Sequence, residues 1–159
     1  MMILRDDRAD INATDSQGRT PFSYSASNHD LPPLTMLLQR QNIDINVADP
    51  GEQIALFYAA KAGNDKATGL LLNCPDIEAN VLDRNYLTPL WHAGSQGLVA
   101  VVNKLLWCPI IEFCPQNERL SPLIAVVDER YHTIFKVLLE SGKVNHHATD
   151  SEGRSAFHC

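Results

Sequence analysis

Pairs of leucines recur along the chain at a nearly constant interval, and each pair closes a short apolar stripe. The steps between pairs are 34, 34 and 33 residues, and the pairs are Leu37-Leu38, Leu71-Leu72, Leu105-Leu106 and Leu138-Leu139. In the stretch LVAVVNKLLW, residues 98–107, apolar side chains follow the period of an α-helix, and the stripe returns in residues 134–139. The pattern predicts a short amphipathic helix late in each interval.

Polar residues repeat at the same interval and mark two further positions in each unit. An aspartate or its amide recurs at Asp15, Asp49, Asp83, Asn117 and Asp150. The start of another helix recurs at Thr20-Pro21, Ile54-Ala55, Thr88-Pro89, Ser121-Pro122 and Ser155-Ala156. Because the three series agree, the sequence predicts a turn and two short helices in each unit. One residue is missing between Asn117 and Ser121, so we expect a tighter fourth turn.

The first helix of most units begins at a residue that can cap it, since a capping hydroxyl accepts hydrogen bonds from free amides of the first turn. Such hydroxyls occur at Thr20, Thr88, Ser121 and Ser155, and prolines suited to a first helical position follow at 21, 89 and 122. Ile54 has no capping oxygen, so we expect its helix to start less firmly, by about 1 kcal/mol. Pro32 and Pro33 fall in the first turn of a second helix, where proline is tolerated.

Two sets of turn residues recur at fixed positions in the units, one between the paired helices and one before each recurring aspartate. Gly63 and Gly97 provide a left-handed conformation between the two helices of a unit. His29 and Arg130 occupy the equivalent slot, so we expect strained residues there. An asparagine stands three residues before an aspartate at Asn12, Asn46 and Asn80. We expect these amide side chains to bond local backbone within a turn.

The stretches DSQGRTPF and TPLWHAGSQG, with the trailing pattern LL…IDIN..D, resemble the ankyrin repeat family. The resemblance covers essentially the whole chain, and the period together with TPLWHA and AVVNKLL looks most like long arrays of filamentous fungal multidomain proteins. It implies an all-α fold, an ankyrin-repeat solenoid of helix-turn-helix units with short β-turn or hairpin fingers. Glu52 and Tyr86 replace the family's usual turn glycine, so we expect less regular middle fingers.

The resemblance assigns the whole chain, residues 1–159, to one ankyrin-repeat domain. Full repeats span 15–48, 49–82, 83–116 and 117–149, while 1–14 ends a preceding repeat and 150–159 begins a truncated one. Since a repeat buries its apolar face only by stacking on neighbours, we expect a fragment of a longer array with weak self-association through its uncapped ends. The apolar residues expected to be exposed there are Ile3, Leu4, Ile134, Phe135 and Leu138.

In this family, turn tips and first-helix faces bind other proteins. The resemblance therefore implies a non-catalytic protein–protein interaction module with an unidentified protein partner. The predicted contact residues are Gln53, Phe57, Lys61, Arg84, Asn85, Tyr86, Leu87, Trp91, Ser95 and Gln96. An alternative for Phe57 and Trp91 is that they stack on each other between repeats. An alternative for the chain is a spacer or sensor segment of a larger receptor-like or enzyme-linked protein.

Composition and charge exclude several other classes of protein. A chain of 159 residues with 45% apolar content suits one globular unit. Its net charge is -6 and its 13 basic residues are scattered, so we do not expect nucleic acid as a partner. No stretch approaches the roughly 18–20 apolar residues of a membrane-spanning helix, and residues 1–10 contain no apolar run of signal-peptide length, so we do not expect entry into the secretory pathway. We therefore expect a soluble protein without a membrane partner.

The cysteines indicate a reducing compartment. Cys74 and Cys108 lie one period apart, which places them on adjacent helices about 8–10 Å apart. This separation exceeds the roughly 7 Å Cα limit of a disulfide. We expect reduced thiols in a cytoplasmic or nuclear protein.

The remaining reactive groups form no recognisable catalytic or metal-binding pattern. Cys159 directly follows His158, and adjacent residues rarely orient each other as a nucleophile and a base. With His146 and His147, His158 also fails to match the spacing of a closed zinc site. The sequence contains no phosphate-binding loop of the type G-x-x-x-x-G-K-[ST]. We therefore predict a protein that is not an enzyme and has no cofactor or metal.

Overall fold

Short helices arranged in pairs make up the computed structural model of this chain, which describes residues 10–111, 136–137 and 139–142. The helices of residues 10–111 are α1 (Pro21–Ser27), α2 (Leu31–Leu38), α3 (Ala55–Lys61), α4 (Asp65–Leu72), α5 (Pro89–Ser95) and α6 (Val99–Trp107). The described residues contain no strand, and the predicted all-α solenoid of helix-turn-helix units is confirmed.

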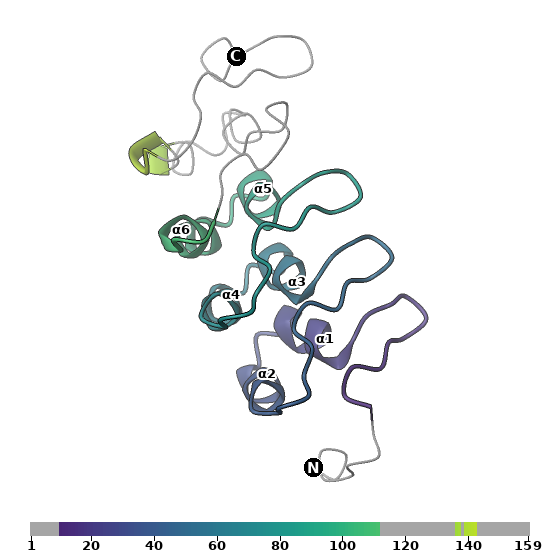
Figure 1. Ribbon diagram of the computed structural model, residues 1–159. Helices are drawn as coiled ribbons and strands as arrows, with labels where there is room; N and C mark the ends of the chain where they lie inside the picture. The colour runs from purple at the N-terminus through teal and green to yellow at the C-terminus, as the bar shows by residue number, and fades with distance from the viewer. Residues whose placement is uncertain (1–9, 112–135, 138, 143–159) are drawn as a thin grey trace.

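The helical pairs stack along one direction, as Figure 1 shows. The first helices α1, α3 and α5 form one row, and the second helices α2, α4 and α6 form another beside it. Before each first helix the chain extends into a finger, a turn spanning residues 15–19, 49–53 or 83–87. The fingers project on the side away from the second helices. The molecule therefore presents two unlike faces, one of fingers and first helices and one of second helices.

The first helices begin as the capping pattern predicts. The hydroxyl oxygens of Thr20 and Thr88 accept the amides of Ser23 and Trp91, both at 3.1 Å, with a proline directly after each cap. Ile54 makes no side-chain cap, and its side chain is buried in the core instead. Burial of this apolar group offsets the missing hydrogen bond. Ser121 and Ser155 lie outside the described residues.

The apolar core lies between the two rows of helices. Its largest fully buried side chains are Phe22, Leu34, Ile54, Leu56, Phe57, Leu71, Val101, Val102 and Leu105. The predicted stripe of the third unit is therefore confirmed, because Leu106 is buried as well. Leu139 is exposed, whereas Ile134, Phe135 and Leu138, like Ile3 and Leu4, lie outside the described side chains.

Glycines between paired helices adopt the predicted left-handed conformation, with φ of 70° at Gly63 and 75° at Gly97. The prediction of a strained His29 is wrong, since His29 has no positive φ. The chain instead leaves α1 through Asn28 in an extended conformation, and the Asn28 side chain accepts the amide of Asp30 at 3.1 Å. A hydrogen-bonded extended turn thus replaces the left-handed residue. Arg130 and the shortened fourth turn lie outside the described residues.

The asparagines that precede the finger aspartates join one repeat to the next, so the prediction of local turn bonds is wrong. The Asn46 side chain donates to the carbonyl of Asp76 at 2.7 Å and accepts the amide of Glu78 at 3.1 Å. Asn12 makes the same pair of bonds to Asn42 and Asp44. Asn80 donates to the carbonyl of Ile110 at 2.7 Å. These asparagine bridges satisfy loop backbone groups of the following repeat.

Two further features bear on cysteine chemistry and membrane insertion. Cys74 and Cys108 are free thiols, and burial, aided by the charge of Asp76, raises the pKa of Cys74. Cys114, Cys159 and the histidines His146, His147 and His158 lie outside the described residues. The described helices are all too short and insufficiently apolar to span a membrane.

Candidate interaction surface

Each finger is closed by its own aspartate. In the third finger the Asp83 carboxylate accepts the amides of Asn85 and Leu87 through Oδ1, at 2.9 and 3.0 Å. The Asp83 amide donates to the Leu87 carbonyl at 3.0 Å, and the Tyr86 amide donates to the Asp83 carbonyl at 2.7 Å. Asp15 and Asp49 make the same set of bonds in their fingers. A carboxylate at this position therefore folds the turn by satisfying its backbone donors.

The residue before the end of each turn is left-handed. Gly18, Glu52 and Tyr86 have φ of 75°, 64° and 61°. The prediction that the middle fingers are less regular is wrong, because their hydrogen bonds match those of the glycine-containing finger. A left-handed backbone costs a non-glycine residue about 1–2 kcal/mol. The aspartate bonds hold Glu52 and Tyr86 in this conformation despite that cost.

Neighbouring fingers touch along their backbones. The amide of Arg84 donates to the carbonyl of Gly51 at 3.0 Å, which joins the second and third fingers. Pro50 occupies the equivalent position one repeat earlier and has no amide to donate. It packs on Gly18 instead, where an added Cβ would lie 2.3 Å from the Pro50 Cδ. The row of fingers is therefore closely packed, and Gly18 has no space for a side chain.

The second carboxylate oxygen of each finger aspartate binds a side chain nine residues further on. Tyr24 donates to Asp15 at 3.0 Å, and Tyr58 donates to Asp49 at 2.6 Å. Arg19 also binds Asp15 at 2.8 Å and lies 4.4 Å over the Tyr24 ring. Hydrogen bonds from the Arg19 amide and guanidinium hold the pKa of Asp15 well below its usual range. Burial, together with the bond to Asp49, raises the pKa of Tyr58 well above its usual value.

In the third repeat His92 replaces tyrosine, and its Nε2 lies 2.8 Å from Oδ2 of Asp83. Burial lowers the pKa of His92, and the nearby Lys61 charge adds to this against the opposing effect of Asp83. Burial acts to raise the pKa of Asp83, but hydrogen bonds from His92 and two backbone amides outweigh it and lower that pKa. At neutral pH the pair is therefore a neutral imidazole donating to a carboxylate.

Among the aromatic residues near this pair, Phe57 packs between repeats, as the alternative interpretation predicts, but against His92 and not directly on Trp91. Phe57 is completely buried, so its prediction as a partner contact is wrong. Phe57 and Trp91 pack edge-to-face against His92, with ring centroids 5.8 and 5.5 Å from the imidazole. They form an aromatic cluster through the histidine, which the interpretation of direct Phe57–Trp91 stacking missed. The spacing of 34 residues from Tyr24 to Tyr58 to His92 could have identified His92 as the residue that binds Asp83 in place of tyrosine.

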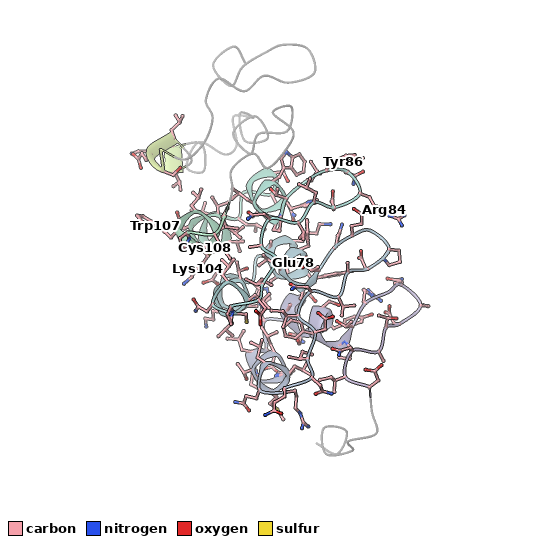
Figure 2. The ribbon with its side chains drawn as sticks, viewed as in Figure 1. Glu78, Arg84, Tyr86, Lys104, Trp107 and Cys108 are labelled. Atoms are coloured by element: carbon pink, nitrogen blue, oxygen red, sulfur yellow. The ribbon has the colours of Figure 1, made fainter. Side chains whose placement is uncertain are left out.

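The other predicted contact residues divide by exposure. Arg84, Asn85, Tyr86 and Gln96 are exposed, whereas Gln53, Lys61, Leu87, Trp91 and Ser95 are partly buried. Tyr86 has 63% of its surface exposed and lies with Arg84 at the third finger, as Figure 2 shows. Lys61 on α3 donates from Nζ to the Gln53 side chain at 2.9 Å, which links the first helix to its finger. The exposed members of the predicted set are thus concentrated at the third finger.

Stacked helical pairs with projecting fingers define a class of protein, the helical repeat solenoid. A family model described as ankyrin repeats (3 copies) matches residues 25–117, more than half of the chain, and the chain belongs to the ankyrin repeat family. The resemblance implied by the sequence is thereby confirmed. Ankyrin repeats are generally protein–protein interaction modules and are typically non-catalytic.

Comparison with solved structures supports the same fold. The chain is similar to the crystal structure of EF0377, described as an ankyrin repeat protein, with a TM-score of 0.86 and 25% sequence identity. The match covers 98% of this chain and 80% of that one. A search of curated proteins gave no match.

Proposed function

We propose that this chain is a non-catalytic interaction module whose protein partner contacts the finger tips and the exposed faces of the first helices. The observation that carries the proposal is Tyr86, a large aromatic side chain that is 63% exposed at the tip of the third finger. Tyrosine is among the residues that contribute most to binding at protein interfaces. Arg84 and Asn85 lie exposed beside it in the same finger and provide polar contacts around the ring.

The backbone of Tyr86 strengthens this proposal. A bulky residue at φ 61° is uncommon, since glycine adopts this conformation without steric cost. Strained backbone of this kind occurs disproportionately at ligand-binding positions. Burial offsets this cost only in part, because 63% of Tyr86 is exposed. Tyr86 is therefore costly for the isolated fold, which supports a role in binding.

The buried Asp83–His92 pair supports a structural role rather than a catalytic one. Its imidazole Nε2 is occupied by the carboxylate, and both Phe57 and Trp91 pack against the ring. In the part of the chain that the structure describes, no serine or cysteine side chain bonds this imidazole. The same described residues include no group of three or more histidine, cysteine and acidic side chains able to hold a metal.

A pair of glycine substitutions tests the proposal. Tyr86→Gly removes the exposed ring and relieves the strained backbone, so the variant remains at least as stable as the parent. Glu52→Gly makes the same backbone change one finger earlier without removing an aromatic group, and is the matched control. Immobilised parent and variant chains are compared for proteins captured from a eukaryotic cell lysate, after thermal unfolding has shown that all are folded.

We expect the parent chain and Glu52→Gly to capture the same partner and Tyr86→Gly to lose it. Equal capture by all three chains would overturn the assignment of the partner to the third finger. Capture that is lost from both variants would show that finger backbone, and not the tyrosine ring, determines binding.

A further inference from the structure

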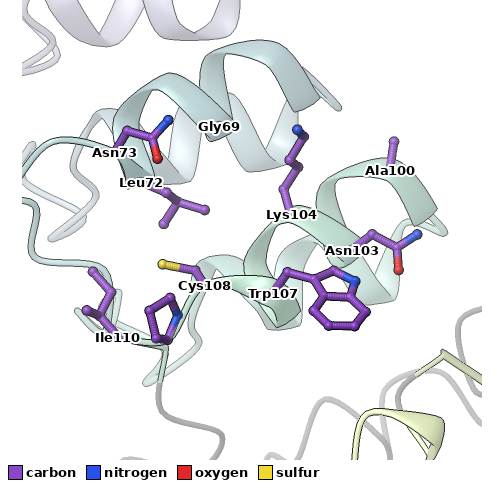
Figure 3. Close-up of a pocket in the computed structure, with 10 residues that line it drawn as sticks. Gly69, Leu72, Asn73, Ala100, Asn103, Lys104, Trp107, Cys108 and Ile110 are labelled. Carbon is purple, nitrogen blue, oxygen red and sulfur yellow. The ribbon is translucent and has the colours of Figure 1, made fainter.

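A groove lies on the face opposite the fingers, between the C-terminal parts of α4 and α6. It has a volume of about 660 Å³ and is drawn in Figure 3. Leu72 and Cys108 line its inner part, and Ile110 and Trp107 stand toward its outer rim. Figure 2 shows Trp107 and Lys104 at the edge of the molecule away from Tyr86. This groove is therefore separate from the finger surface.

Trp107 makes the groove unusual. Its side chain is 85% exposed, and Ile110, which also lines the groove, is 46% exposed. The positions equivalent to Trp107 in the two preceding repeats are the polar residues Gln39 and Asn73. An apolar side chain that large is costly in water, and contiguous exposed apolar groups mark interaction sites. The third repeat thus carries an apolar feature that the first two lack.

Lys104 gives the groove its charge. It lies one turn before Trp107 on α6, so the two side chains share a helix face. Its stem crosses α4 at Gly69, where an added Cβ would lie 3.7 Å from Cδ, Cε and Nζ of the lysine. These are ordinary van der Waals distances, so the lysine stem packs along α4 at Gly69. Lys104 is exposed and lines the groove from the α6 side.

The charge of Lys104 has no partner among the described residues. It takes part in none of the ion pairs found there, and the groove lining contains no carboxylate. The other polar lining groups are the amides of Asn73 and Asn103, which are neutral. In a chain with a net charge of -6, this groove is a local site for a negative group.

We propose that the groove binds a protein segment in which a carboxylate stands next to a large apolar side chain. The carboxylate pairs with Lys104, the apolar side chain covers Trp107 and Ile110, and the asparagine amides bond the backbone of the segment. A nucleic acid fits the site less well, because phosphate backbones bind through several cations and this groove supplies one. The surface is independent of the partner assigned to Tyr86.

A display selection from a library of random peptides tests this proposal. Peptides are selected on the parent chain and counter-selected on Trp107→Ala, which keeps only sequences that need the indole. Since Trp107 is mostly exposed, its removal leaves the core intact, and thermal unfolding of the variant checks this. Binding of the selected peptides is then followed by tryptophan emission in a Trp91→Phe background, where Trp107 is the sole indole.

Two charge reversals separate a specific contact from general electrostatics. Lys104→Glu changes the groove, and Lys66→Glu makes the same change on α4 at an exposed position outside the groove lining. We expect selected peptides to carry an acid beside an apolar residue, to shift the emission of Trp107 to shorter wavelength and to bind Lys66→Glu normally. Lys104→Glu should bind them roughly tenfold more weakly.

The proposal is overturned if counter-selection leaves no enriched peptides, if those enriched lack acidic residues, or if Lys104→Glu binds them as well as Lys66→Glu does. Tyr86→Gly should bind the selected peptides unchanged. Loss of binding in that variant would place the peptides on the fingers and would also overturn the groove assignment, without affecting the function proposed for Tyr86.

Discussion

The second repeat, whose finger begins at Asp49, and the third, whose finger begins at Asp83, close these fingers with different side chains. Tyr58 donates to Asp49 in the second repeat, and His92 occupies the same place on Asp83 in the third. The finger backbones are otherwise alike, down to the left-handed residues at 52 and 86. One carboxylate oxygen therefore sets the shape of the finger, and the other receives a side chain that can vary.

This division separates shape from chemistry. Oδ1 binds backbone amides, which every residue except proline supplies, so the turn tolerates different side chains around it. Oδ2 binds a side chain, so replacing tyrosine by histidine changes the titration of the site without moving the backbone. Repeats can therefore differ in the side chain that binds Oδ2 while their finger backbones keep the same conformation.

The largest expected effect is a loss of stability that tests whether the second and third repeats have equivalent cores. Leu71 and Leu105 are equivalent and both fully buried. Replacing either by alanine removes apolar contacts and leaves a cavity, so each variant should lose roughly 2–5 kcal/mol of stability. Urea unfolding followed by circular dichroism measures the loss. If one of the two variants lost only a few tenths of a kcal/mol of unfolding free energy, the two leucines would not be equivalent core positions.

The next effect concerns pH. The lowered pKa of His92 means that the unfolded chain binds its proton more tightly, since the unfolded pKa is about 6.5. The stabilisation is complete above that value and is lost as the pH falls through the lower folded pKa. We expect His92→Tyr, which copies the second repeat, to lose less stability than the parent between about pH 7 and pH 5. Thermal unfolding over this range measures the difference.

The reciprocal change provides the control for this titration. Tyr58→His places an imidazole on Asp49, in a partly buried site like that of His92. This variant should become more sensitive to acid than the parent. Equal pH dependence of the parent, His92→Tyr and Tyr58→His would show that residues elsewhere determine the acid response.

The smallest effect should come from the left-handed finger residues. Glu52→Gly and Tyr86→Gly each remove a steric cost and add backbone freedom to the unfolded chain, for a net gain of roughly 0.5–1 kcal/mol. Equilibrium unfolding in urea measures this gain. A loss of stability at Tyr86 with a gain at Glu52 would indicate that the exposed tyrosine ring makes folded-state contacts that its glutamate counterpart does not.

Sequence alone predicts the frame of this molecule well, because repetition exposes positions that serve the backbone. The recurring aspartates, the capping threonines and the glycines at 63 and 97 act through local bonds and dihedrals. Their spacing is therefore enough to identify them. The buried leucine stripe follows for the same reason, since its period reflects the helix itself.

Features that depend on the neighbouring repeat were predicted less well. Asn46 was expected to bond its own turn, yet its partners lie 30 and 32 residues away. Phe57 was expected at the surface, but α5 of the following repeat covers it with His92. In each case the deciding contact involves geometry that the period of the sequence does not contain.

The asparagine bridges imply a natural unit of genetic exchange. Asn46 reaches the carbonyl of Asp76, and Asn80 reaches the carbonyl of Ile110, over the same 30-residue separation. Excising residues 49–82 would bring Asn46 to the Ile110 carbonyl, with no bridge lost at the new junction. Duplicating that segment would likewise create one further complete bridge. Recombination in steps of 34 residues therefore lengthens or shortens this part of the array without disturbing its joints.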